Sequence, residues 1–409
     1  MATLVGTGTR RPPAPTLPRV PTRLLLILLA VLAGNAIWFF GANALDSVGQ
    51  VPNAGRDALH KLLLLADVGV VMFMAAEWMG PRLRYFTRRL VLGAITVFII
   101  ITLIYFVLNA IPGEKWYSHL LNVRNSTPAH LANIKHLLGI DRPVYVQFLT
   151  YLNQLIAIPP DLGYSTALSQ TVWQAIVTHI GPTAILMSTA YIVQMLIAIP
   201  VGVISAVKPY SKIDNFVTSF SFFGISLPNY WFGSMLIYLF AILPIQLGHS
   251  AIFPVGGQHT GEQTGIGDLA WHLVLPVIVL AVQGIAQDAR YTRSAMLDVL
   301  GQDYIRTARA KGLSGWAVIM RHAFRNSLLP IITLAGLEIP QLFAGAIITE
   351  FVFNWHGMGQ LTVNQAESGD LITVVGIMMV LASLVVIGNI VADLAYTLAD
   401  PRITFGKRA

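Results

Sequence analysis

The feature that most constrains this chain is a series of long apolar runs that hold almost no charged residues. A helix that crosses a bilayer needs about 20 mostly apolar residues, and eight runs approach or exceed this length. They cover residues 24–40, 62–79, 90–111, 182–206, 216–243, 273–287, 328–353 and 372–398. Charged residues make up only 11% of the chain, whereas a soluble domain carries about 25%. The sequence therefore predicts an all-α polytopic membrane protein with about eight transmembrane helices.

Lysine and arginine are concentrated in alternate connections between these runs. With eight spans, the basic connections fall on one face of the membrane together with both termini. Cytoplasmic loops of membrane proteins carry an excess of Lys and Arg, so the sequence predicts that both termini are cytoplasmic. Outside the basic segment described below, the residues concerned are Arg10, Arg11, Arg19, Arg23, Arg82, Arg84, Arg88, Arg89, Lys208, Lys212, Arg402, Lys407 and Arg408.

The N-terminal part of the chain divides into a tail and two spans. Residues 1–22 are rich in Pro, Thr and Arg and have no apolar period, which predicts a disordered cytoplasmic tail. Residues 23–80 then hold two transmembrane helices. A secretory signal is the alternative for the first of them, because Ala42-Asn43-Ala44 resembles a cleavage site. The apolar run is longer than the 7–15 residues of a signal core, and this favours an uncleaved helix.

Charge and cysteine content exclude several classes of function. The formal net charge is +7, but no compact polar domain is present to form a nucleic-acid groove. In a membrane protein, such a basic excess is typical of cytoplasmic loops and of contact with membrane lipid. The chain has no cysteine, which excludes disulfides, thiol catalysis and thiolate metal sites.

A polar, strongly basic segment, residues 288–325, lies between the sixth and seventh apolar runs. Its centre reads as two short helices joined at Gly312. We expect Asp303 to cap the first helix, and Gly312 to end it in the left-handed conformation. Ser314 would then begin the second helix. Leu329-Pro330 would lead into the next span, because proline is tolerated in the first turn of a helix.

The first short helix has two different faces. Helical spacing places Tyr304, Ile305 and Ala308 on one face and turns Arg306 and Arg309 towards the other. A loop that only orients the chain needs positive charge, but it needs no caps, hinge or ordered face. We therefore expect this segment to dock on another protein.

These residues resemble the coupling-helix motif of ABC-importer permeases, in particular the dipeptide/oligopeptide branch, which includes nickel and glutathione importers. Arg306-Thr307-Ala308 stands where the general motif has Glu-Ala-Ala, and Gly312 supplies its glycine. The resemblance covers about residues 85–405, and His356 stands where proline is common. Matching segments are Asp161-Leu-Gly163, Gly224-Ile-Ser-Leu-Pro228, Leu275-Pro276, Ala289-Arg-Tyr-Thr-Arg-Ser294, Glu350-Phe-Val-Phe-Asn-Trp-His-Gly-Met-Gly359, Asp393-Leu-Ala-Tyr396 and Asp400-Pro-Arg402.

The resemblance implies a fold and a set of partners. Residues 85–405 would form the permease domain, with a six-helix type I ABC importer core and a cytoplasmic coupling loop at residues 288–326. The chain would pair with a second homologous permease as a heterodimer in the inner membrane of a bacterial cell. Two ATP-binding subunits and an extracytoplasmic substrate-binding protein would complete the transporter. The residues that would couple to the ATPase are Tyr304, Arg306, Thr307, Ala308, Arg309, Lys311 and Gly312.

The chain lacks a phosphate loop of the form Gly-x-x-x-x-Gly-Lys-Ser/Thr. We therefore expect no catalysis and no cofactor in this chain, with ATP and Mg²⁺ bound by the partner subunits. The resemblance favours di- and oligopeptides as cargo, and nickel or glutathione are the alternatives. An ion-coupled secondary transporter and a membrane-embedded enzyme are the rival classes. The former needs no coupling helix, and the chain has neither His-Glu-x-x-His nor Gly-x-Ser-x-Gly for the latter.

Ionisable residues at membrane depth are candidates for function. Glu338 and Glu350 are the candidates for the translocation path, and hydrogen bonding between helices is the alternative role for each. Residues 113–181 and 249–268 form two outward loops, the first with a predicted amphipathic helix at residues 130–138. Either loop could dock an external partner. Four histidines in these loops have no metal-ligand spacing, so we expect no metal site: His130, His136, His249 and His259.

Overall fold

The computed structural model describes residues 61, 63–65, 67–72, 81–110, 143–155, 160–165, 167–261 and 265–399. The predicted tail 1–22, the first predicted span and the amphipathic helix at residues 130–138 lie outside this part. Within the second predicted span, the described residues include a short apolar helix, Leu63–Met72. The prediction of two N-terminal transmembrane helices therefore lies largely outside the described residues.

Long apolar helices dominate the described part of the chain and confirm the all-α prediction. Four of these helices are long and apolar enough to cross a membrane, or five if one bent pair counts as a single span. The four are α3 (Pro81–Ala110), α6 (Val172–Val207), α10 (Ile266–Leu300) and α15 (Leu371–Ala399). Another long helix, α13 (Arg325–Val352), covers the predicted seventh span. The strands in the described residues are β1 (Tyr164–Ser165) and β2 (Gln170–Thr171), which pair antiparallel.

Helix α6 begins ten residues earlier than the apolar run predicts. Its N-cap is Thr171, whose side chain accepts a hydrogen bond from the backbone N–H of Gln174, while the Gln174 side chain accepts one from the backbone N–H of Thr171. This reciprocal capping box satisfies two backbone donors at the helix start. Pro182, where the run begins, therefore lies inside the helix.

The predicted fifth span, residues 216–243, is not one straight helix but lies in a bent pair of helical segments. Helix α7 (Lys212–Ser226) is followed by α8 (Asn229–Ile237), the π-helical turn η3 (Tyr238–Ile242) and α9 (Leu243–Gln246). The two halves meet at 98°. The break lies at Leu227-Pro228, where Leu227 has an extended backbone. A residue before proline is driven out of the helical region, and proline lacks the N–H that would continue the helix.

Helices α6 and α10 pack closely along their length. At Gly202 the backbones approach so closely that a Cβ would stand 2.6 Å from the carbonyl oxygen of Ala289. Leu186 and Ala190 of α6 are buried against Leu273 and Val277 of α10 in one apolar cluster. Helix α10 extends beyond the short predicted run at both ends. It contains Asp288–Leu300, which the sequence assigned to the basic segment.

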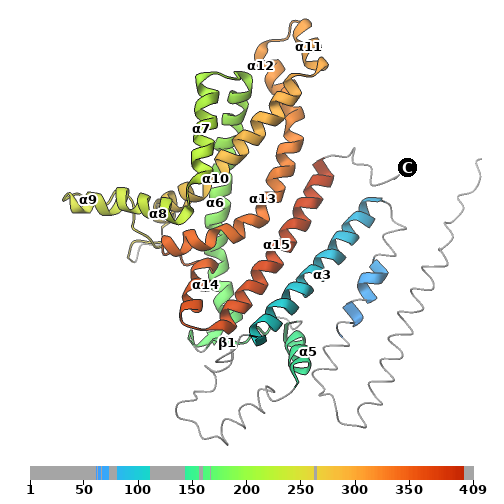
Figure 1. The fold of residues 1–409 in the computed structure, drawn as a ribbon, viewed down its shortest axis with the longest axis vertical. Helices are drawn as coiled ribbons and strands as arrows, with labels where there is room; N and C mark the ends of the chain where they lie inside the picture. Colours follow the sequence, from blue (N-terminus) through green and yellow to red (C-terminus); the bar gives the residue numbers. More distant parts are fainter. Residues whose placement is uncertain are drawn as a thin grey trace, which may run out of the picture.

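The other helices lie beside this pair or pack on one another. Helix α14 (Met358–Glu367) connects α13 to α15, and α3 packs against α15. Helix α5 (Val144–Leu155), which the sequence analysis missed, packs against α3 through Tyr105, Phe148 and Leu152. Figure 1 shows α5, α14 and β1 towards one end of the molecule. The other end carries α11 (Asp303–Ala310) and α12 (Gly315–Ala317), and we call it the α11 end.

Candidate functional site

Helix α11 sits on the tip of the α6–α10 pair and is held there by apolar contacts. Ile305 and Ala308 are buried in a cluster with Ala206 of α6 and Met296 of α10. Val318 and Ala323 complete this cluster from η4 (Val318–Phe324), the π-helical segment that follows α12. Fully burying a side chain such as isoleucine stabilises a fold by about 1.5–3 kcal/mol. The short helix is therefore fixed to the spans and is not a loose loop.

The start of α11 differs from the prediction. Its N-cap is Gln302, which makes no side-chain cap hydrogen bond, and Asp303 lies in the first helical turn. The prediction that Asp303 caps the helix is wrong, because the chain leaves its extended conformation one residue earlier. The Asp303 carboxylate lies 3.5 Å from the Arg306 guanidinium, with both side chains largely exposed. Such an exposed pair contributes little to stability.

The end of α11 is a glycine turn, as predicted. Gly312 has a φ of +76°, in the left-handed region that a side chain penalises by about 1–2 kcal/mol. Its N–H donates to the carbonyl of Arg309 at 3.0 Å, and the N–H of Lys311 donates to the carbonyl of Thr307 at 3.0 Å. Because a Cβ at Gly312 would meet no atom within 4 Å, the backbone conformation alone requires glycine here.

The second short helix begins at Ser314, also as predicted. The Ser314 hydroxyl accepts a hydrogen bond from the Ala317 N–H at 3.3 Å. Helix α12, η4 and α13 then follow one another without a break, since the residues at each junction keep helical backbone angles. Pro330 therefore lies inside α13 and not at the start of a new helix, which corrects the predicted boundary.

The seven predicted coupling residues do not share one environment. Ala308 is buried in the apolar cluster, whereas the others are exposed: Tyr304, Arg306, Thr307, Arg309, Lys311 and Gly312. Tyr304 is 45% exposed, so it lies at the edge of the helix face that Ile305 and Ala308 bury. Leu313 and Trp316 are also exposed, Trp316 at 72%. The free surface of α11 and α12 thus combines positive charge with aromatic and apolar side chains.

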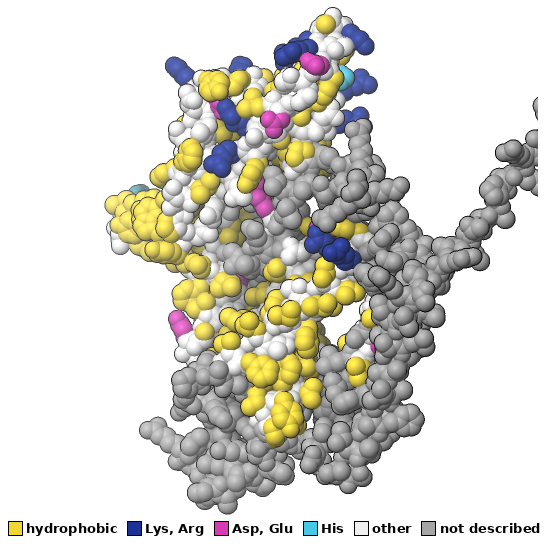
Figure 2. Space-filling view, turned by 45° about the vertical axis from the view of Figure 1, so that its right-hand side comes forward, with side chains coloured by type: hydrophobic (Ala, Val, Ile, Leu, Met, Phe, Trp, Pro, Cys, Tyr) yellow, Lys and Arg dark blue, Asp and Glu magenta, His cyan; other side chains and the backbone are white. Residues whose placement is uncertain are grey.

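Positive charge is concentrated at the α11 end. Figure 2 shows Lys and Arg side chains gathered there, and hydrophobic side chains cover much of the described surface below them. The start of α3 lies beside the end of α15, where the Arg89 guanidinium is 3.1 Å from the Asp393 carboxylate. Both of these helix ends point towards the α11 end in Figure 1. These helix ends and the α11 end therefore face the same way, although α3 and α15 stop short of α11.

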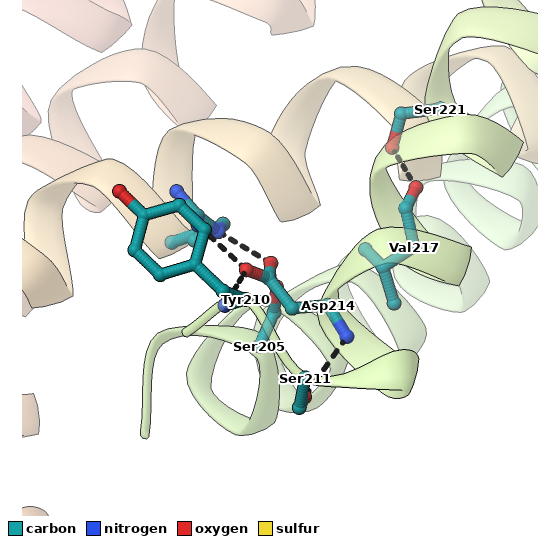
Figure 3. Close-up of polar contacts among 7 residues, drawn as sticks. Ser205, Tyr210, Ser211, Asp214, Val217 and Ser221 are labelled. Carbon is teal, nitrogen blue, oxygen red and sulfur yellow. Dashed lines mark hydrogen bonds and ion pairs between the residues drawn. The ribbon is translucent and has the colours of Figure 1, made fainter. Parts of the chain in front are cut away.

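A buried carboxylate links three helices just beside α11. Asp214 of α7 is 2% exposed and accepts two hydrogen bonds from Arg293 of α10, from Nε at 2.6 Å and from Nη2 at 2.7 Å. It also accepts from the Ser205 hydroxyl of α6 and from the backbone N–H of Tyr210 at 2.8 Å. Figure 3 shows Ser205, Tyr210 and Ser211 arranged around Asp214. The two-pronged contact of Arg293 engages both oxygens of this buried carboxylate, a strong charge-assisted arrangement.

Sequence reasoning missed the Asp214–Arg293 pair. Two signals were available for it. Ser211 followed three residues later by Asp214 marks a helix start, and the Asp214 N–H does donate to Ser211 Oγ at 3.3 Å. Arg293 belongs to a segment, residues 289–294, that also carried the family resemblance. Their separation of 79 residues in the chain hid the pairing.

A second polar link lies deeper among the helices. Gln194 of α6 donates from Nε2 to Asp288 of α10 at 2.6 Å and to Glu338 of α13 at 2.9 Å. Gln194 and Asp288 are buried, and a Cβ at Gly284 would overlap the Gln194 carboxamide. Glu338, a predicted path residue, thus contacts the two central helices. Its role in translocation stays a prediction.

Glu350, the other predicted path residue, is fully buried at the junction of α13 and α14. Its Oε2 accepts hydrogen bonds from the backbone N–H of Gly359 at 2.6 Å and of Gln360 at 3.3 Å. A carboxylate at the N-terminus of a helix is stabilised by the free N–H groups and by the helix dipole. Glu350 therefore anchors the start of α14, and a part in the path stays a prediction here too.

Sequence comparison assigns most of the chain to one family. Residues 198–405 match the profile of the family described as binding-protein-dependent transport system inner membrane component. Residues 82–188 match the N-terminal region described for the same kind of membrane component. Together the two matches cover nearly all of the described helices, including the whole α11 end.

Several relatives match this chain over almost their entire length. The oligopeptide transport system permease protein AppB of Bacillus subtilis is 40% identical over 78% of this chain and 99% of its own length. The dipeptide transport system permease protein DppB of Escherichia coli K12 is 35% identical over 80% of this chain and 100% of its own. The di/tripeptide transport system permease protein DppB of Pseudomonas aeruginosa is 36% identical over 78% and 98%.

A solved chain of the MetNI methionine ABC transporter overlaps 56% of this chain and 97% of its own, at 17% identity and a TM-score of 0.44. That similarity is too low to define the fold, which follows from the sequence families. With both family regions matched and relatives covered end to end, the chain belongs to the family of binding-protein-dependent transport system inner membrane components, the ABC-importer permeases.

Proposed function

We propose that this chain is a permease subunit of a bacterial peptide importer, driven by ATP that separate subunits hydrolyse. The observation that carries the proposal is the α11 end. There a short helix, bound to the spans through Ile305 and Ala308, turns an exposed basic face outward. The peptide cargo rests on relatives that are named for oligopeptide, dipeptide and di/tripeptide transport.

In this proposal the α11 end faces the cytoplasm of the cell, and both termini lie on that side of the inner membrane. The excess of Lys and Arg at this end supports the orientation. Tyr304, Arg306 and Arg309 contact a groove of one ATPase subunit, and Gly312 fixes the angle between α11 and α12. A second permease, a second ATPase and an extracytoplasmic binding protein complete the importer.

The mechanism is alternating access. ATP binding brings the two ATPases together, and α11 carries their movement to α6 and α10 because the three helices share one buried cluster. Cargo then crosses between the two permeases, with Glu338 and Glu350 proposed near its path. Residues 1–80 precede the matched families, which begin at residue 82, so we place the two N-terminal spans outside the shared permease domain.

Uptake into proteoliposomes tests this function. The complex is purified through a tag on this chain and reconstituted with ATP inside. Di- and oligopeptides, Ni²⁺ and glutathione are then offered with the binding protein. We expect peptide accumulation that requires ATP and that does not change when ion gradients are collapsed. Uptake that follows an ion gradient without ATP would contradict the proposal, and ATP-driven uptake of Ni²⁺ or glutathione alone would replace its cargo.

A further inference from the structure

The turn between α6 and α7, residues 208–212, presents one of the most exposed aromatic side chains of the described surface. Tyr210 is 86% exposed, and Lys208 and Lys212 on either side are exposed as well. Figure 3 shows the Tyr210 ring extending away from the Asp214 carboxylate that holds its backbone. An exposed tyrosine flanked by two positive side chains is well suited to contact another molecule.

The backbone of Tyr210 is held in an unfavourable conformation. Its φ is +62°, in the left-handed region, where a residue other than glycine costs about 1–3 kcal/mol. The conformation persists because the Tyr210 N–H donates to Asp214, which Arg293 and Ser205 fix in turn. The network therefore does more than close a turn, because it keeps a large ring pointing outward at the expense of local strain.

The turn belongs to the same rigid unit as α11. Ala206, two residues before Lys208, is buried in one cluster with Ile305 and Ala308 of α11. Arg293 holds the turn through its contact with Asp214. It lies near the end of α10, the helix that leads into α11. Tyr210 follows Ala206 by four residues, and four residues of extended chain reach at most about 14 Å. Tyr210 is therefore close enough to α11 for one partner to cover both.

The position of the turn argues for a protein partner over a lipid surface. Ala206, just before the turn, shares one buried cluster with Ile305 and Ala308 of α11, the helix proposed to meet the ATPase. Lys and Arg side chains gather at this same end of the molecule (Figure 2). A protein that receives α11 therefore reaches the turn as well, and vesicles with and without anionic lipid separate this partner from a lipid surface in the experiment below.

We propose that residues 208–212, with Tyr210 at the tip, form a second contact with the ATPase subunit that receives α11. The Tyr210 ring packs on that subunit, and Lys208 and Lys212 face acidic side chains on it. Two separate contacts on one rigid unit resist rotation, so that closure of the ATPases tilts α6 and α10 together. This inference rests on the proposed function, since it requires an ATPase partner.

Cross-linking from single cysteines tests the inference, because the chain has no cysteine of its own. Tyr210→Cys, Arg309→Cys and Tyr145→Cys are each introduced into the full complex in lipid nanodiscs. Tyr145 is 62% exposed on α5, towards the opposite end of the molecule, and serves as the control. A short thiol-to-amine reagent is added, and mass spectrometry identifies the protein in each cross-linked product. A product counts as the ATPase when the linked protein contains a phosphate-loop sequence.

We expect Tyr210→Cys and Arg309→Cys to link to the ATPase, and Tyr145→Cys to give no such product. If only Arg309→Cys links to the ATPase, the second contact is disproved and the proposed function stands. If neither position links to it, the proposed function fails as well.

Tyr210→Gly supplies a second readout that does not depend on cross-linking. Glycine adopts a positive φ without strain, so the variant removes the ring while the turn and the thermal stability of the complex are kept. We expect ATP-driven uptake to fall at least fivefold, equally in vesicles with and without anionic lipid. A defect that appears only with anionic lipid would assign the turn to the membrane surface, and unchanged uptake would also overturn the inference.

Discussion

Arg293 of α10 donates two parallel hydrogen bonds to the carboxylate of Asp214 on α7, at 2.6 and 2.7 Å. The arginine side chain is 23% exposed and the aspartate 2%. This pair joins α10, which leads into α11, to the start of α7. Asp214 also accepts a hydrogen bond from Tyr210 in the turn between α6 and α7. It makes the end of the molecule that carries α11 one body, which a partner can move as a unit.

The first prediction concerns this pair. Removing one partner of a buried ion pair leaves the other charge unpaired, which costs about 3–5 kcal/mol. Because Arg293 keeps some contact with solvent, we expect Asp214→Asn to cost about 3 kcal/mol. Arg293→Lys should also destabilise, since lysine cannot form the two-pronged contact. Thermal unfolding in detergent measures both variants, and an unchanged melting temperature for Asp214→Asn would show that the pair is not structural.

A second prediction separates the two faces of α11. Ile305 is fully buried, and truncating a buried isoleucine to alanine costs about 2–5 kcal/mol. Tyr304 is exposed, so Tyr304→Ala should leave the melting temperature unchanged and reduce the affinity for the ATPase. We expect Ile305→Ala to lower the melting temperature clearly. If Tyr304→Ala destabilises the chain as much as Ile305→Ala, the assignment of the two faces is wrong.

A third prediction concerns Glu350. Glu350→Ala removes the acceptor of two buried N–H groups at the start of α14, and each unsatisfied buried group costs about 1–3 kcal/mol. Glu350→Gln keeps an amide oxygen as acceptor, so we expect the glutamine variant to be the more stable of the two. Melting temperatures test this order. Equal loss in both variants would indicate that the negative charge, and not the hydrogen bonds, anchors α14.

A fourth prediction addresses the polar link among the spans. Glu338→Ala should reduce peptide uptake if Glu338 lies near the path, as proposed. Gln194→Ala breaks the same hydrogen bonds from the other side and serves as the matched comparison. Uptake reduced by Glu338→Ala and much less by Gln194→Ala supports a direct role of the carboxylate. Full uptake by Glu338→Ala would remove Glu338 from the path.

Local signals in the sequence predicted the features that depend on nearby residues. Gly312 takes the left-handed conformation and Ser314 caps the next helix because each of these roles needs only a few neighbouring residues. The apolar runs predicted the spans for the same reason. The sequence also contains a capping box, Thr171 with Gln174, which predicts the observed start of α6.

The features that depend on tertiary packing were missed or misplaced. Asp214 and Arg293 meet only because α7 returns along α10. The exposure of Tyr304 depends on how α11 seats against Ala206 and Met296. The bend before Pro228 was open to prediction from proline chemistry, yet the apolar run across it suggested one span. Periodicity and composition report on which residues are buried in membrane or core, but they do not report which helices are neighbours.

The central claim is that α11 passes the work of the ATPases to the spans, and the ratio of peptide transported to ATP hydrolysed tests it most directly. The ratio is measured in proteoliposomes for the unmodified complex, for Gly312→Val and for Gly315→Ala as control. Gly315 has no positive φ and no atom within 4 Å of an added Cβ, so its variant should couple normally. We predict that Gly312→Val hydrolyses ATP with at least a tenfold lower transport ratio, because valine is penalised at a φ of +76°. An unchanged ratio in Gly312→Val would contradict the account.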